Sequence, residues 1–141
     1  MEFKKYKLFI KGEWCDGNNN GEYIERQNPR SGDIIAKYIN GSYHDIDDAS
    51  EVGIATLRSG VWSGLSREEK SYILSNVANI IANKTTELAN VESMETGKSM
   101  KDAINDINNS VKYWRYASSI VRVEYGDFIN NLEGNKAGYT V

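Results

Sequence analysis

The chain has 141 residues, a formal net charge of −3 and a pI near 5.2. This length suits one domain, or part of a larger one, and allows a real core. The acidic balance argues against a nucleic-acid partner, because such surfaces need a basic footprint. The only cysteine, Cys15, cannot form an internal disulfide and suits a reducing compartment. The apolar run at residues 8–10 is too short for a signal-peptide core or a membrane span. The sequence therefore predicts a cytoplasmic chain without a membrane partner.

The first 40 residues are predicted to form strands and turns. Residues 8–14 have the pattern of a short hairpin, in which Gly12 supplies the positive φ that a tight turn requires. Two further extended segments are predicted at residues 22–27 and 33–39. The turn between them, residues 28–32, holds the only proline of the chain.

The first predicted helix follows the strands and ends by Gly60. Ser42 is placed to cap it, with Asp45 at the third helical position. Its buried edge is predicted to consist of four residues at helical spacing: Ile46, Ala49, Gly53 and Leu57.

The second predicted helix begins at the capping box formed by Ser66 and Glu69 and runs to Gly97, a natural helix stop. It carries one apolar stripe, made of Ile73, Val77, Ile80, Ile81 and Leu88.

The third predicted helix begins at Ser99, which has Asp102 three residues later, and runs to about Val123. Its polar or amphipathic edge carries Asp106, Asn109 and Tyr113. After residue 123 the helical period is lost, and short extended pieces are predicted at residues 128–129 and 139–141. The core stripe of this helix is predicted to be Met100, Ile104, Ile107, Val111, Trp114 and Val121.

Several of these segments, in this order, resemble the N-terminal region of the aldehyde dehydrogenase superfamily. They are Phe-Ile-Lys-Gly-Glu-Trp at residues 9–14, Asn-Pro-Arg-Ser-Gly at 28–32, Trp-Ser at 62–63, Glu-Leu-Ala at 87–89 and Glu-Thr-Gly-Lys at 95–98. Some residues of these segments depart from the family pattern. Lys11 replaces an Asn, Glu95 replaces an Asp and Ser99 replaces a Pro.

The resemblance implies an α/β fold. It consists of an N-terminal β-hairpin and strand segment plus three amphipathic helices of a coenzyme-binding domain, ending before the Rossmann-type core. Residues 1–125 would belong to that domain, and residues 126–141 would start the strands that bridge subunits. The partner implied is the remainder of an aldehyde dehydrogenase chain. The complete enzyme would use NAD or NADP to oxidise an aldehyde to a carboxylic acid, as a homo-oligomer.

No catalytic or cofactor-binding residue is expected within the 141 residues. The family's nucleophilic thiolate, its water-activating carboxylate and its oxyanion donors lie in segments that this sequence does not contain. No two of the 12 glycines are two positions apart, so the sequence has no G-x-G phosphate cradle. Cys15 and His44 are far apart in sequence and are interpreted as a half-buried thiol and a solvated imidazole. The chain alone is therefore expected to be inactive.

Two sites are implied by the resemblance alone. Na⁺ or K⁺ would be held by the main-chain carbonyls of Arg26 and Gln27 and by the carboxylate of Glu95; the alternative is a solvated Glu95 at a helix end. The polar edge formed by Asp106, Asn109 and Tyr113 would line the substrate tunnel; the alternative is that Asn109 is exposed on a surface helix.

Two functions outside the family stay open at this stage. One is a free-standing, non-catalytic helical interaction module, and the other is a ligand-binding domain. The sequence does not decide which aldehyde is used, whether the cofactor is NAD or NADP, or what the oligomeric state is.

Overall fold

Residues 4–18, 21–123, 128–132 and 136–139 are described by the structure, which is a computed structural model. They form a mixed α/β arrangement that begins with strands and continues with four helices, as the fold class predicted, except that three helices were expected. In chain order the elements are β1 (Lys4–Tyr6), β2 (Leu8–Ile10), β3 (Glu13–Cys15), β4 (Tyr23–Gln27), β5 (Ile34–Ile39), α1 (Tyr43–Ser59), α2 (Arg67–Asn83), α3 (Thr85–Thr96), α4 (Met100–Ile120), β6 (Phe128–Leu132) and β7 (Lys136–Tyr139).

The strands confirm the predicted hairpin and both predicted extended segments. β2 and β3 pair antiparallel across Lys11 and Gly12, whose φ angles of 57° and 81° are the two positive values of a type I′ turn. β5 lies between β4, which is antiparallel to it, and β1, which is parallel to it. β1 was not predicted, because its sequence Lys-Lys-Tyr has no apolar alternation.

α1 is attached to the strands through the buried carboxylate of Asp45. Ser42 and Asp45 form the predicted capping box. The same carboxylate accepts hydrogen bonds from the main-chain N–H of Asn18 at 3.0 Å and from its side-chain amide at 2.9 Å. The main-chain N–H donors of Ser42 and then Asn18 lower the pKa of Asp45 below its ordinary value. Gly17 suits this position because its φ is +69° and because a Cβ would lie tightly against Leu8 Cδ1, at 3.1 Å.

The predicted buried edge of α1 is wrong. Ile46 is 62% exposed and Leu57 is 76% exposed, and Ala49 and Gly53 are exposed as well. Gly53 makes no close helix contact, because an added Cβ would meet nothing within 4 Å. The periodicity correctly identified an apolar face. Ile46 and Ala49 border β2 across an open groove, whereas Leu57, further along the helix, lies open to solvent.

The single helix predicted between Ser66 and Gly97 is two helices in the structure. The capping box of Ser66 and Glu69 begins α2 as predicted. The helix then breaks at Lys84, where φ is −110° and ψ is 16°. The hydroxyl of Thr85 donates to the carbonyl of Ala82 at 2.8 Å, a local bond that competes with the helical ladder. Gly97 ends α3 in the left-handed conformation, as predicted.

α4 begins at Ser99 as predicted and ends at Ile120, three residues before the predicted end. Of its predicted core stripe, Val111 is buried, Trp114 is 36% exposed, and the other four residues are half-buried. Ala103, outside that stripe, is fully buried. The helix therefore packs closely through small side chains. Among the described residues, the buried hydrophobic side chains are Ala36, Ile39, Ala78, Ala89, Ala103 and Val111.

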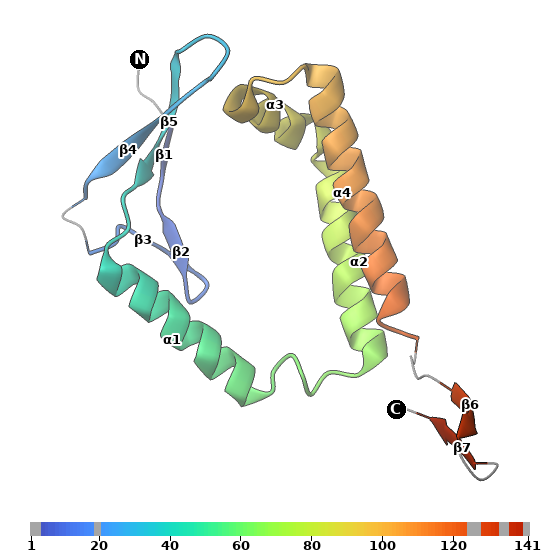
Figure 1. Cartoon of the computed structure of the whole chain (residues 1–141). Helices are drawn as coiled ribbons and strands as arrows, with labels where there is room; N and C mark the ends of the chain where they lie inside the picture. The colour runs from blue at the N-terminus through green and yellow to red at the C-terminus, as the bar shows by residue number, and fades with distance from the viewer. Residues whose placement is uncertain (1–3, 19–20, 124–127, 133–135, 140–141) are drawn as a thin grey trace.

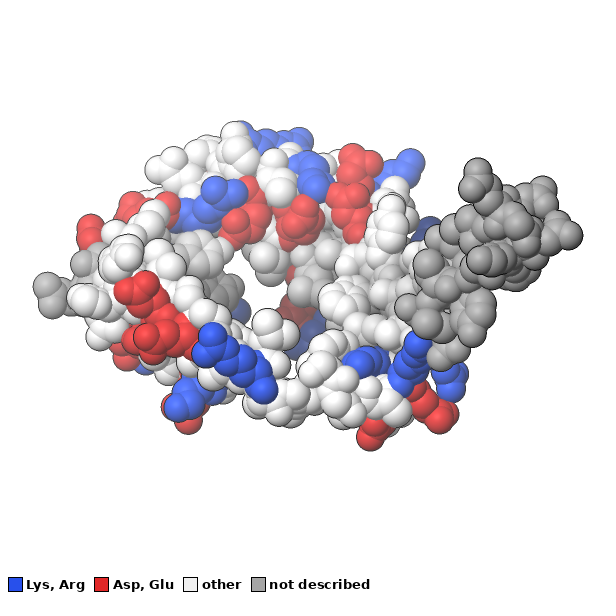
Figure 2. Space-filling model, turned by 60° about the horizontal axis from the view of Figure 1, so that its bottom comes forward, with Lys and Arg blue, Asp and Glu red and all other residues white. Residues whose placement is uncertain are grey.

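The elements form two arms (Figure 1). The strand arm contains β1–β5 and α1, and the helix arm contains α2–α4, with α2 and α4 packed side by side. The arms are linked in sequence by residues 60–66, and the turn between β4 and β5 meets α3 at the opposite end. Figure 2 shows an opening between the arms and, on that face, acidic and basic side chains mixed together. The β6–β7 hairpin lies beyond the end of α4.

None of the helices formed by the described residues has the length and apolar character needed to cross a bilayer.

Candidate functional site

The candidate site is the junction where the end of α3 meets the turn between β4 and β5. α3 ends with Gly97, whose φ is +74° and whose N–H donates to the carbonyl of Ser93 at 2.9 Å. A Cβ at Gly97 would lie 3.1 Å from Pro29 Cγ and 3.4 Å from Arg30 Cβ. Two features therefore favour glycine at position 97: the left-handed backbone conformation and the close approach of the turn.

The turn itself is shaped by Asn28. Its side-chain oxygen accepts from the N–H of Arg30 at 2.8 Å, and its main-chain carbonyl accepts from the N–H of Gly32 at 2.8 Å. This is an Asx-type turn, which Asn forms readily because its side chain mimics a main-chain carbonyl. The ring of Pro29 is thereby presented to Gly97.

Glu95 joins the two arms through its carboxylate. Arg26 in β4 donates from Nε to Glu95 Oε2 at 2.7 Å, and from Nη2 to the main-chain carbonyl of Glu95 at 2.8 Å. Tyr38 in β5 donates its hydroxyl to Glu95 Oε1. The Glu95 side chain is 23% exposed and that of Arg26 is 47% exposed, so the ion pair is only partly screened by solvent.

The ionisation of Tyr38 is set by this contact. Its hydrogen bond to Glu95, then burial, and then the nearby negative charge raise the pKa of Tyr38 to about 12. The ring also stacks on Tyr6, with centroids 5.2 Å apart. Tyr38 is therefore a fixed hydrogen-bond donor to Glu95 at neutral pH.

Lys98 completes the junction on the helix side. Its ammonium lies 2.7 Å from Asp106 Oδ2 in α4 and 2.6 Å from Glu92 Oε1 in α3. Hydrogen bonds to Asp106 and then to Glu92 raise the pKa of Lys98 above its ordinary value. The Glu-Thr-Gly-Lys segment thus links the β-sheet, α3 and α4 within four residues.

The structure brings together Arg26 and Glu95, two of the three residues expected to hold Na⁺ or K⁺. They meet through the guanidinium of Arg26, whereas the expectation concerned its main-chain carbonyl. Gln27 ends β4 next to Arg26. Both carboxylate oxygens of Glu95 already accept hydrogen bonds, and one of the donors carries a positive charge. In this arrangement the residues do not fit a bound cation at Glu95, and the cation site stays a prediction.

The sequence analysis missed Tyr38 and Lys98 as members of the junction. Sequence alone shows that Arg26 and Glu95 carry opposite charges, but it does not bring these two residues together, because they are 69 positions apart. The position of Tyr38 depends on the register of β4 against β5, which pairs Ile24 with Tyr38 and Arg26 with Ala36. That register is not specified by the sequence pattern alone.

The three residues expected to line a substrate tunnel all lie exposed on α4. Asp106 is paired with Lys98, as described above. Asn109 accepts a hydrogen bond from Lys112 at 3.3 Å, and Tyr113 is 74% exposed. Nothing in the structure tests whether they meet a substrate.

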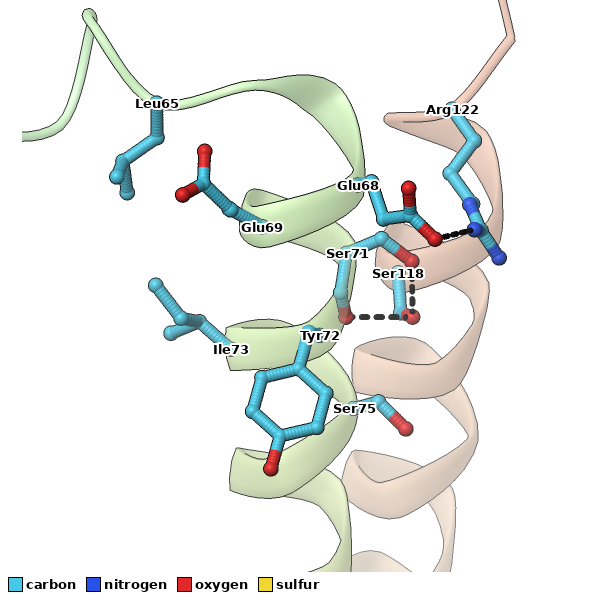
Figure 3. Close-up of a pocket in the computed structure, with 9 residues that line it drawn as sticks. All are labelled: Leu65, Glu68, Glu69, Ser71, Tyr72, Ile73, Ser75, Ser118 and Arg122. Atoms are coloured by element: carbon cyan, nitrogen blue, oxygen red, sulfur yellow. Dashed lines mark hydrogen bonds and ion pairs between the residues drawn. The ribbon is translucent and has the colours of Figure 1, made fainter.

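A groove of about 640 Å³ lies where the start of α2 meets the end of α4 (Figure 3). On its inner side the hydroxyl of Ser118 donates to the carbonyl of Ser71 at 2.9 Å. Leu65 and Ile73 project away from α4, and Tyr72, which is 68% exposed, also borders the groove. This end of the helix pair therefore presents apolar side chains beside polar ones.

Comparison with known families identifies the chain. The model of the aldehyde dehydrogenase family matches residues 14–141, so the chain belongs to the aldehyde dehydrogenase family. It corresponds to the N-terminal part of the family, as the sequence predicted. The comparisons give no support to the alternative of a free-standing helical interaction module.

Two enzymes illustrate the extent of the match. The chain is 31% identical to NAD(P)+ aldehyde dehydrogenase 2 of Saccharomyces cerevisiae over 136 residues, which are 95% of this chain and 26% of the yeast protein. It is 26% identical to aldehyde dehydrogenase family 2 member C4 of Arabidopsis thaliana, over 99% of this chain and 28% of that protein. The chain thus spans about a quarter of the length of these relatives.

Solved structures show the same fold. The crystal structure of an NAD-dependent aldehyde dehydrogenase from Sinorhizobium meliloti superposes with a TM-score of 0.83 at 27% identity, covering 98% of this chain and 28% of that one. A betaine aldehyde dehydrogenase from Staphylococcus aureus, solved with NAD+, superposes with a TM-score of 0.81 at 22% identity, covering 89% of this chain and 25% of that one.

Replacing Gly97 with Ala should destabilise the chain. The left-handed backbone alone costs a non-glycine residue about 1–2 kcal/mol, and the added Cβ would press on Pro29. Gly53→Ala is the matched control, because that glycine lies inside α1 with open space around it; this change should raise stability by up to about 1 kcal/mol. Denaturant unfolding measures both variants. Equal stabilisation by the two alanines would show that the turn does not pack on Gly97.

Proposed function

We propose that the chain acts as the N-terminal segment of a complete NAD- or NADP-dependent aldehyde dehydrogenase that oxidises an aldehyde to a carboxylic acid. The observation that carries this proposal is the family match over residues 14–141, in a chain that spans about a quarter of its relatives. The nicotinamide cofactor would accept the hydride, and the catalytic groups would come from the remainder of the enzyme.

The uncovered apolar faces support a role as part of a larger protein. On α1, Leu57 is 76% exposed, and on α2, Ile80 is 59% exposed. No large side chain among the described residues is fully buried. Apolar faces of this kind become stable when another element covers them. The proposed cover is the remainder of the same enzyme, in which residues 1–125 belong to the coenzyme-binding domain.

The last strands are proposed to belong to the subunit-bridging arm of a homo-oligomer. β6 and β7 form an antiparallel hairpin set apart from the other two sheets. Thr140 and Val141, which the sequence analysis included in the final extended piece, lie outside the described residues. A cytoplasmic setting also remains a proposal, based on the single cysteine.

Dehydrogenase activity should require more than these 141 residues. The chain alone, offered several aldehydes with NAD or NADP, should produce reduced cofactor only at the background rate. The protein translated from the whole reading frame should produce it at enzymatic rates. Cys15→Ala should change neither result, because Cys15 lies in β3 and is not proposed to act as the nucleophile. Turnover by the chain alone that Cys15→Ala abolishes would overturn the proposal.

The polar edge of α4 is proposed to face the substrate entrance, so that Asn109 favours a small polar aldehyde. In the complete enzyme, Asn109→Met should raise kcat/KM for long-chain aldehydes relative to short polar ones. An unpaired amide beside an alkyl chain costs roughly 1–3 kcal/mol, equivalent to about a ten- to hundredfold change in specificity.

Asn90→Met is the matched control for that substitution. Asn90 is an exposed asparagine on a different helix, α3. Its replacement should leave the ratio of kcat/KM values unchanged. If Asn109→Met also leaves the ratio unchanged, Asn109 is a surface residue and the inference about the substrate is withdrawn.

A further inference from the structure

The guanidinium of Arg26 holds two oxygens of one residue. Its Nε lies 2.7 Å from Glu95 Oε2, and its Nη2 lies 2.8 Å from the main-chain carbonyl oxygen of Glu95. The guanidinium is planar and remains charged at every physiological pH, so this two-pronged contact places a permanent positive charge at the junction.

These two oxygens lie in an environment that favours a cation. Glu95 is in the last turn of α3, where the negative end of the helix dipole attracts positive charge. The carboxylate adds a full negative charge, and carboxylate and carbonyl oxygens are the ligands that hard cations prefer. Tyr38 donates to the other carboxylate oxygen and so fixes the position of the group from the opposite side.

We propose that Arg26 is the built-in cation of this junction. Its guanidinium occupies the place where Na⁺ or K⁺ was expected, so the chain binds neither ion at Glu95. Removing the guanidinium leaves the carboxylate and the main-chain carbonyl of Glu95 without a positive partner and creates a site for a monovalent cation. The proposal concerns the stability of this chain and does not depend on dehydrogenase activity.

The test compares thermal unfolding of the chain in potassium, sodium and choline chloride at matched ionic strength. Choline is too large to enter a site formed by two oxygens of one residue. The unaltered chain should have the same Tm in the three salts. Arg26→Ser should have a Tm that is higher in potassium or sodium than in choline by roughly 4 °C or more. Sodium NMR relaxation should detect binding to Arg26→Ser and not to the unaltered chain.

Two further variants control for charge and for general salt effects. Arg26→Lys keeps a positive charge near Glu95 and should show no preference among the salts. Lys7→Ser removes the cation of another ion pair, also 2.7 Å long, in which Asp16 contributes only its side chain. It should lose stability equally in all three salts, because no second oxygen holds an ion there.

Two results would overturn the proposal. One is sodium or potassium binding by the unaltered chain that Glu95→Gln abolishes, since that places an ion at Glu95 despite Arg26. The other is an Arg26→Ser variant that folds, responds equally to the three salts and does not broaden the sodium signal. If Arg26→Ser is unfolded in every salt, the proposal is judged on the sodium titrations of the unaltered chain and of Glu95→Gln, which show whether an ion binds at Glu95.

Discussion

The contact of Glu95 with Arg26 and Tyr38 is the interaction on which the arrangement of the two arms depends. Residues 60–66 connect the strand arm to the helix arm at one end. At the other end, this contact joins β4 and β5 to α3, next to the turn between the two strands (Figure 1). The neighbouring Gly97 lets Pro29 approach the end of α3, and Lys98 ties α3 to α4. The Glu-Thr-Gly-Lys segment therefore has a structural role, because it holds the strands, α3 and α4 together.

The thin core explains why that junction matters. The described buried hydrophobic residues are mostly alanines, which let helices approach closely but bury little apolar area. Large apolar side chains lie instead on faces that nothing in the described chain covers, such as that of Leu57 on α1. In the proposed complete enzyme, whose relatives are about four times as long as this chain, these faces would pack against other elements. Within the described residues, the polar contact of Glu95 with Arg26 joins the two arms.

The sequence allowed the ends of the helices to be predicted, but not which surfaces pack together in the folded chain. The caps at Ser42, Ser66 and Ser99 and the stop at Gly97 were predicted correctly, because a cap requires only a few neighbouring residues. The break at Lys84 was missed, since the apolar spacing continues across it. Periodicity identified apolar faces without showing which of them the chain itself covers. The role of Arg26 required the position of β4 against α3, which no short pattern encodes.

A double-mutant cycle tests most directly whether this contact holds the arms together. The free energies of unfolding of Arg26→Met, Glu95→Gln and the double variant are compared with that of the unaltered chain, with choline as the added cation. A direct bond between a charged donor and a partly buried carboxylate predicts a coupling energy of about 1 kcal/mol. Effects that add to within about 0.3 kcal/mol would contradict the account, because additive residues do not interact.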